Sequence, residues 1–141
     1  MNSLTVDQFT ERYAAAVFAK DVDALLGLYD DGVRLFDLWG VWSYEGAPAW
    51  RQAVADWFAS LGAQRVGVGF DDVSIIGGDD LAMVNAIITY RDLSPDGAEE
   101  GSMQNRLTWV LKNTDDRWKI IHEHTSAPVD FDTSTVMLHR G

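Results

Sequence analysis

Cysteine is absent from this chain of 141 residues. Without thiols the protein has no disulfide, no cysteine nucleophile and no cysteine-ligated metal, and the composition fits the cytoplasm, where we expect the protein to reside. No apolar run approaches membrane-spanning length, so we expect no membrane partner. The first five residues lack a basic segment followed by an apolar one, which predicts no signal peptide.

Basic residues are also scarce. Lys and Arg number 11 against 22 Asp and Glu, which gives a formal net charge of −11. A surface this acidic repels phosphate backbones, so we expect no nucleic-acid partner. The acid pairs lack the alternating spacing of a calcium loop. No glycine-rich phosphate loop and no Gly-X-Ser-X-Gly elbow occurs, so covalent catalysis has no support in the sequence.

What the chain does contain is a clear order of elements. The segment Thr5-Val6-Asp7-Gln8 predicts a capping box that opens a helix, and Phe9, Tyr13 and Val17 form one face of that helix. The periodicity predicts further helices over about 22–29 and 48–61, with a turn at 30–32 between the first of these and a strand over 33–38. Four more strands follow, at about 65–76, 81–93, 100–113 and 117–126. This order predicts an α+β domain over residues 1–128, with helices on one face of the sheet and an extended tail over 129–141.

The last strand is unusual because both of its faces combine apolar and ionisable side chains. Strict alternation puts Trp118, Ile120, His122 and His124 on one face, and Glu123 on the other. The strand is therefore predicted either to line a partly polar cavity or to pack against a second subunit.

The two histidines are open to three interpretations. His122 and His124 could bind a metal, act as acid–base groups, or bond polar neighbours in the sheet. A metal site needs a third ligand, and the remaining histidine, His139, lies in the tail. No known ligand spacing is present, so we expect no metal site.

Asp37 is the first candidate for chemistry. It ends the first predicted strand beside Phe36, Trp39 and Trp42, and poor solvation in such surroundings raises a carboxyl pKa and makes the group a better base near neutral pH. Tyr13 could donate the hydrogen bond that a developing oxyanion needs. The alternative is structural, because an Asp after a strand often bonds turn amides and a helical Tyr often belongs to the core.

Three segments carry a resemblance to a known family. The final strand, Trp118 to Pro128, resembles the closing strand of SnoaL-like proteins, and is similar to that of the calmodulin-dependent kinase association domain in its Trp, its alternating His pair, and the Ser and Pro that follow. Arg12-Tyr13 resembles the helix of ketosteroid isomerase that carries the oxyanion tyrosine. Asp37-Leu38-Trp39-Gly40 resembles the segment that carries its catalytic base. The chain thus resembles the SnoaL-like and ketosteroid-isomerase-like proteins of the NTF2-like superfamily.

The resemblance implies a cone-shaped, cystatin-like α+β fold in which a curved mixed or antiparallel sheet wraps the helices around an apolar pocket. It also implies a homodimer and no cofactor. The isomerase has a further carboxylic acid in its oxyanion hole, whereas this chain has none between Ser102 and Thr114. The association domain carries an arginine where this chain has Thr125, so its anion pocket is not expected here.

Two functions are therefore expected. The first is cofactor-free proton transfer (isomerisation, dehydration or cyclisation) on a small apolar carbonyl compound, with Asp37 as base, Tyr13 as oxyanion donor and His122 or His124 as auxiliary acid. The second is a non-catalytic ligand-binding or dimerisation module. The residues expected to line the ligand site are Trp39, Trp42, Trp57, Tyr90, Asn105, Trp109 and Trp118.

Overall fold

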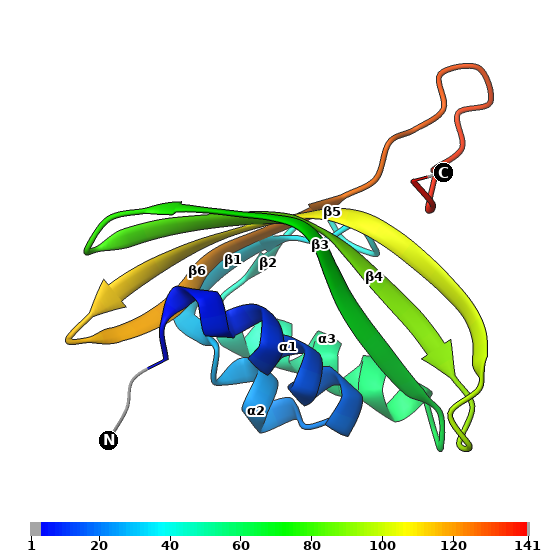
Figure 1. Cartoon of the computed structure of the whole chain (residues 1–141), viewed down its shortest axis with the longest axis horizontal. Helices are drawn as coiled ribbons and strands as arrows, with labels where there is room; N and C mark the ends of the chain where they lie inside the picture. The colour runs from blue at the N-terminus through cyan, green and yellow to red at the C-terminus, as the bar shows by residue number, and fades with distance from the viewer. Residues whose placement is uncertain (1–3, 141) are drawn as a thin grey trace.

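The computed structural model describes residues 4–140 and shows helices lying under one face of a curved sheet (Figure 1). Residues 1–3 and 141 lie outside the described residues. The expectation that the first five residues form no signal peptide therefore concerns a segment that the structure describes only in part. The helical elements are η1 (Val6–Gln8), α1 (Phe9–Ala19), α2 (Val22–Leu26) and α3 (Ala47–Ser60). The strands are β1 (Tyr29–Phe36), β2 (Tyr44–Glu45), β3 (Arg65–Gly77), β4 (Leu81–Leu93), β5 (Glu99–Thr114) and β6 (Arg117–Ser126).

The six strands form one mixed sheet in the order β2-β1-β6-β5-β4-β3. β1 runs parallel to β6, and the other neighbouring strands are antiparallel. The predicted α+β class with a curved mixed sheet is confirmed. None of the helices within residues 4–140 is both long and apolar enough to cross a membrane.

The helices begin where the sequence predicts. The Thr5 backbone amide donates to Gln8 Oε1 at 2.9 Å, as expected of a capping box. Phe9, Tyr13 and Val17 are buried on one side of α1. The Asp21 side chain then caps α2 by accepting a hydrogen bond from a backbone amide in its first turn.

The core lies between these helices and the inner face of the sheet. Val84 of β4 pairs with Trp109 of β5, which pairs in turn with Glu123 of β6, so all three side chains share that inner face. Val84 and Trp109 are fully buried. Within residues 4–140, no helix covers the opposite, outer face (Figure 1).

A β-bulge in β6 overturns the predicted faces of that strand. Leu111 pairs with Ile120, whereas the preceding residue, Val110, pairs with His122, so Ile121 is an extra residue on β6. Before the bulge, Trp118 and Ile120 face the core. After it, Glu123 and Thr125 are buried and His124 is exposed. The prediction that His122 and His124 share a face with Trp118 and Ile120 is therefore wrong, because alternation holds only within an unbroken ladder.

The predicted turn at 30–32 lies inside β1 rather than before it. The register between β1 and β6 shifts between Tyr29 and Arg34. There the Gly32 amide donates to Asp30 Oδ2 at 2.9 Å, which is the local bond that favours Asp in turns. α2 correspondingly ends at Leu26, earlier than the periodicity predicts.

The C-terminal tail is not a simple extended arm. It leaves the sheet, turns back through a bridge between Val129 and Val136, and returns to β5. The Gln104 amide donates to the Leu138 carbonyl at 2.6 Å, and Arg140 forms an ion pair with Asp72 at 2.5 Å. These bonds attach the tail to β5 and β3, and the sequence shows no periodicity that predicts them.

Candidate functional site

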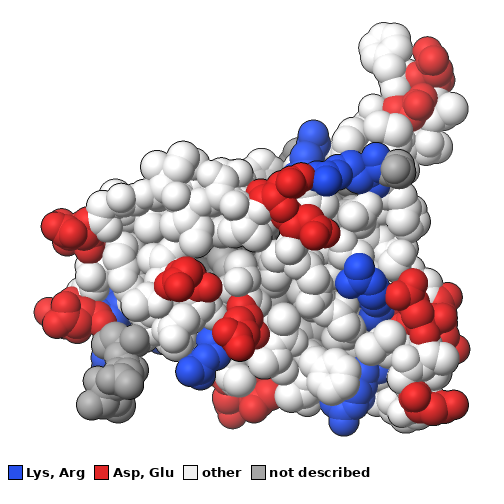
Figure 2. Space-filling view, in the orientation of Figure 1, with Lys and Arg blue, Asp and Glu red and all other residues white. Residues whose placement is uncertain are grey.

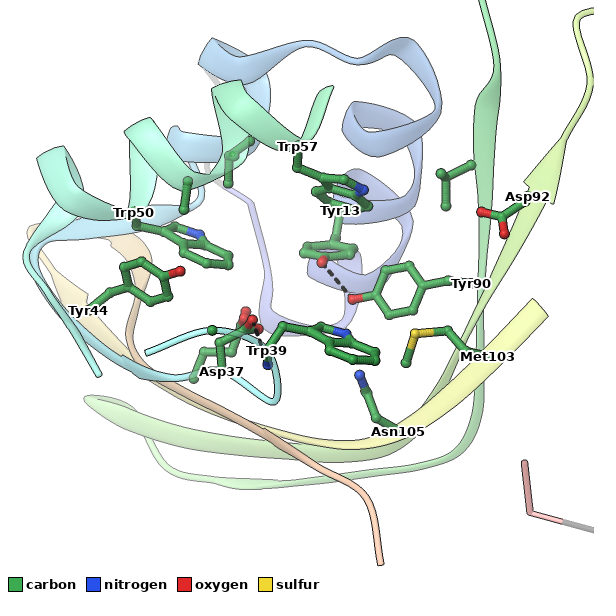
Figure 3. A pocket seen from close by; sticks show the side chains of 15 residues that line it. Tyr13, Asp37, Trp39, Tyr44, Trp50, Trp57, Tyr90, Asp92, Met103 and Asn105 are labelled. Atoms are coloured by element: carbon green, nitrogen blue, oxygen red, sulfur yellow. Dashed lines mark hydrogen bonds between the residues drawn. The ribbon is translucent and has the colours of Figure 1, made fainter. Parts of the chain in front are cut away.

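A cavity of about 490 Å³ opens between the helices and the inner face of the sheet (Figure 3). Its aromatic lining comes from α1, α3, β4 and the segment between β1 and α3. The aromatic lining residues are Tyr13, Trp39, Tyr44, Trp50, Trp57 and Tyr90. The polar lining residues are Asp37, Asp92, Asn105 and Glu123. A largely apolar chamber with a few polar groups is the usual form of a small-molecule site.

Asp37 reaches the cavity from the end of β1. The Trp39 amide donates to Oδ2 at 3.2 Å, and the Thr125 hydroxyl lies 3.3 Å from Oδ1. Thr125 also accepts a hydrogen bond from the Leu38 amide at 2.9 Å, which fixes the chain just after Asp37. Burial raises the pKa of Asp37, and the bonds from Trp39 and Thr125 offset part of that rise.

Tyr13 and Tyr90 form a pair on another wall of the cavity. Their hydroxyl oxygens lie 2.9 Å apart, joining α1 to β4 (Figure 3). Burial raises the pKa of both phenols, so both stay protonated at neutral pH. One hydroxyl donates to the other, which leaves one phenolic proton for a ligand.

Glu123 is the residue that the sequence analysis missed. Its side chain is only 3% exposed, and its Oε1 accepts two hydrogen bonds, from the Tyr29 hydroxyl at 2.5 Å and from Trp109 Nε1 at 2.8 Å. Burial raises the pKa of Glu123 to about 7, and the nearby charge of Asp37 adds to the rise. Strict alternation assigned Glu123 to the face opposite Trp118, so only the position of the bulge could have revealed it.

Two further buried polar atoms border the cavity without a partner. Asn105 is 5% exposed, and its Oδ1 has no hydrogen-bond donor within residues 4–140. Trp50 Nε1 likewise forms no hydrogen bond of good geometry there, although it lies near enough to the Tyr29 hydroxyl to act on the pKa of that phenol. Buried polar atoms are nearly always paired in proteins, so the Asn105 oxygen is available to a ligand or to water.

The structure brings some of the predicted ligand residues together and separates others. Trp39, Trp57, Tyr90 and Asn105 line the cavity together with Tyr13 and Asp37. Three predicted residues do not line it, and each has a different environment. Trp42 is 97% exposed, and Trp109 is a fully buried core residue that donates a hydrogen bond to Glu123. Trp118 packs against the core near the start of β6.

The two histidines lie on the outer side of the sheet. The ring of Phe36 lies edge-on to His122 at 5.1 Å and to His124 at 5.5 Å, and His122 Nδ1 lies 2.7 Å from the Arg34 carbonyl oxygen. Neither histidine lines the aromatic cavity, whereas His124 borders a second hollow that Asp37 also borders. Within residues 4–140, no cluster of three or more His, Asp or Glu side chains could hold a metal ion.

A second hollow of about 600 Å³ lies behind the segment that follows β1. Phe36, Trp42 and His124 border this second hollow. Asp37 and Gly40 border both it and the aromatic cavity. The segment after β1 therefore forms a wall between the two spaces.

Comparison with known proteins gives a consistent result for fold. The family model described as the SnoaL-like domain matches residues 6–130. An NTF2-like protein of unknown function from Pseudomonas putida is similar, with a TM-score of 0.84 and 22% identity over 96% of this chain and 93% of its own.

Two other solved structures share the fold at lower identity. A protein from Xanthomonas campestris, described provisionally as a calcium/calmodulin-dependent protein kinase II association domain, has a TM-score of 0.74 and 18% identity over 87% of this chain and 85% of its own. A protein of unknown function with a cystatin-like fold from Nostoc punctiforme has a TM-score of 0.69 and 16% identity over 93% of this chain and 98% of its own. No curated protein matches the chain.

Proposed function

The chain belongs to the SnoaL-like family, and from that premise we propose that it binds a small, largely apolar carbonyl compound and transfers a proton within it, without a cofactor. The observation that carries this proposal is the Asp37 carboxyl, which borders a predominantly aromatic cavity and has a raised pKa. A base whose pKa approaches the working pH is the effective one for general base catalysis.

Asp37 would remove a proton from the carbon next to the carbonyl group. The electron pair of the broken C–H bond then moves onto the carbonyl oxygen, which becomes an enolate oxygen. Return of the proton from Asp37 to a different carbon completes an isomerisation, with no net gain or loss of atoms. Expulsion of a hydroxyl group from the next carbon, which leaves as water with the proton held by Asp37, instead completes a dehydration and regenerates the base.

The Tyr13–Tyr90 pair would stabilise the enolate oxygen. One phenolic proton is free, and a hydrogen bond from a desolvated donor is strong where water is excluded. Figure 3 shows the pair and Asp37 on different elements, and all three side chains line the same cavity. The proposed machinery therefore consists of Asp37 as the base and the Tyr13–Tyr90 pair as the hydrogen-bond donor.

Deuterium exchange tests this reaction without knowledge of the natural substrate. β-Tetralone incubated with the protein in deuterium oxide should lose its α-proton signals faster than in buffer alone, as followed by proton NMR. Asp37→Asn should abolish the acceleration, and Tyr13→Phe should reduce it by about a hundred- to a thousandfold, the usual cost of one oxyanion donor. Asp56→Asn, on the exposed side of α3, is the matched control and should exchange like the wild type.

Equal exchange by the wild type and Asp37→Asn, with bound ligand detected in both, would remove the catalytic proposal. It would leave the second candidate, a non-catalytic ligand-binding or dimerisation module.

One observation favours a dimerisation role, whether or not there is catalysis. Ile76, Met83, Val110 and His122 pair directly across four strands and so share the outer face that no helix covers. We propose that two copies of the chain associate through this face.

A further inference from the structure

The charged side chains that border the cavity are all acidic. Among residues 4–140 these are Asp37, Asp92 and Glu123, and no Lys, Arg or His borders it. The four ion pairs found in this part of the chain are all exposed, and none includes Asp37 or Glu123. A buried carboxyl group either stays protonated or is paired with a positive group, so the ionised forms of Asp37 and Glu123 have no counter-charge from the protein.

The rest of the lining is aromatic. The ring centroids of Tyr44 and Trp50 lie 5.3 Å apart on one side, and those of Trp57 and Tyr90 lie 6.0 Å apart on the other. The face of an aromatic ring carries negative electrostatic potential and attracts cations, most strongly for Trp. Aromatic rings and carboxylates together therefore favour the same kind of ligand.

We propose that the carbonyl compound bound in this cavity also carries a single ammonium group on its apolar body, and that Glu123 is the counterion of that ammonium group. This inference deepens the proposed function, since it rests on the cavity binding a small molecule and names the class of that molecule. Asp37 remains the base. The two carboxyl groups thus have separate roles, one in chemistry and one in recognition.

The geometry of Glu123 suits that role. Both of its hydrogen-bond donors, Tyr29 and Trp109, contact Oε1, and neither contacts Oε2, which stays available to a ligand. The Trp109 side chain is fully buried, which fixes the position of one of the two donors to Oε1. A carboxylate held this firmly is a preorganised partner for an ammonium group.

The groups that surround Glu123 reinforce the preference for a cation. Asp37 is an acid, and Tyr13, Tyr29 and Tyr90 are neutral phenols that become only negative on titration. None of them can neutralise an ionised Glu123. A bound ammonium can do so, and it should therefore lower the pKa of Glu123 from about 7 and release a proton.

The field of the whole molecule acts in the same direction. The chain carries a net charge of −11, and Figure 2 shows acidic side chains spread over one face with fewer basic ones between them. Asp92 at the end of β4 is exposed and borders the cavity. Negative potential at the mouth of a low-dielectric cavity concentrates cations and repels anions.

Three probes that share an indole ring test the inference by calorimetry at a pH above 7, where Glu123 is ionised. They are tryptamine, its neutral derivative N-acetyltryptamine, and the anion indolepropionate. We expect tryptamine to bind most tightly and indolepropionate not to bind. Glu123→Gln should weaken tryptamine at least tenfold, about 1.4 kcal/mol, while Glu11→Gln on the exposed side of α1 should bind like the wild type.

Repeating the tryptamine titration near neutral pH in buffers of different ionisation enthalpy should reveal proton release, and Glu123→Gln should lack it. If N-acetyltryptamine or indolepropionate binds as tightly as tryptamine, the amine inference is overturned while small-molecule binding stands. If none of the three probes binds, small-molecule binding in this cavity is contradicted as well. The comparison of probes on the wild type decides between these outcomes even if Glu123→Gln does not fold.

Discussion

Glu123 shows at the residue scale how a buried acid couples stability to pH. Its pKa is about 7 in the folded protein and near 4.5 in the unfolded chain, so between these values the folded state holds the proton more firmly. The free energy of unfolding therefore falls as the pH rises from 4.5 through 7. For a fully buried group with a shift of this size, the loss is on the order of 3 kcal/mol.

Glu123→Gln should remove most of this dependence. Gln keeps an oxygen that can accept from Tyr29 and Trp109, but it does not titrate. Urea unfolding below pH 4.5 and above pH 7 should show the wild type losing stability at the higher pH, and the variant losing much less. Asp37→Asn is the comparison, because burial raises the pKa of Asp37 in the same direction but to a smaller extent.

A wild type that is equally stable on both sides of this pH range would contradict the raised pKa of the buried Glu123 carboxyl group. A slope that persists unchanged in Glu123→Gln would assign the effect to another group. Either result would also weaken the counterion role, because both rest on the same enclosed side chain.

At the scale of elements, the bulge at Ile121 determines which side chains of β6 enter the cavity. Ile121 is the extra residue, so its deletion places Ile120 and His122 next to each other opposite Leu111 and Val110 in an unbroken ladder. Alternation then keeps Glu123 and Thr125 on the inner face without a bulge. We therefore expect the deletion variant to keep cooperative unfolding in thermal melts followed by near-ultraviolet circular dichroism. Ile121→Val keeps the bulge and should stay within about 1.5 kcal/mol of the wild type. A deletion variant that loses cooperative unfolding would show that the pairing of β6 needs the bulge itself.

The strand bounds were predictable from the sequence, whereas the bulge in β6 was not. The bounds of β4 and β6 match the prediction, because Gly, Asp and Pro at their ends end the strands through local turn chemistry. The capping box of η1 is local for the same reason and is confirmed. The bulge depends on how β6 pairs with β1 and β5 at once, and no local pattern encodes that pairing.

The residues of the candidate site were likewise predicted where they precede the bulge of β6 in sequence, and not where they follow it. Tyr13 and Asp37 lie on α1 and at the end of β1, before any irregularity of β6, and both border the cavity as the sequence analysis expected of a ligand site. Their catalytic roles stay predictions. Glu123, His122 and His124 follow the bulge, so the sequence analysis exchanged their faces.

At the scale of the whole molecule, the uncovered outer face predicts association. Val110 lies on that face between Met83 and His122, so a charge there would be buried in a dimer built on this surface. Val110→Glu should convert a dimer to a monomer of 15.7 kDa in light scattering after size exclusion. Gln52→Glu, an equal change of charge on the exposed side of α3, should leave the mass unchanged. A wild type that is monomeric at high concentration would remove the proposed dimer.

The wall between the two hollows has a consequence for turnover. Asp37 borders the second hollow as well as the aromatic cavity, so its carboxyl group has a side that does not depend on the ligand. In the proposed reaction, a proton that Asp37 has taken from a substrate on the inner side can exchange with bulk water on the outer side before it returns to the carbon skeleton. Hydrogen from the solvent should then appear in the product, although the reaction as a whole neither gains nor loses a proton.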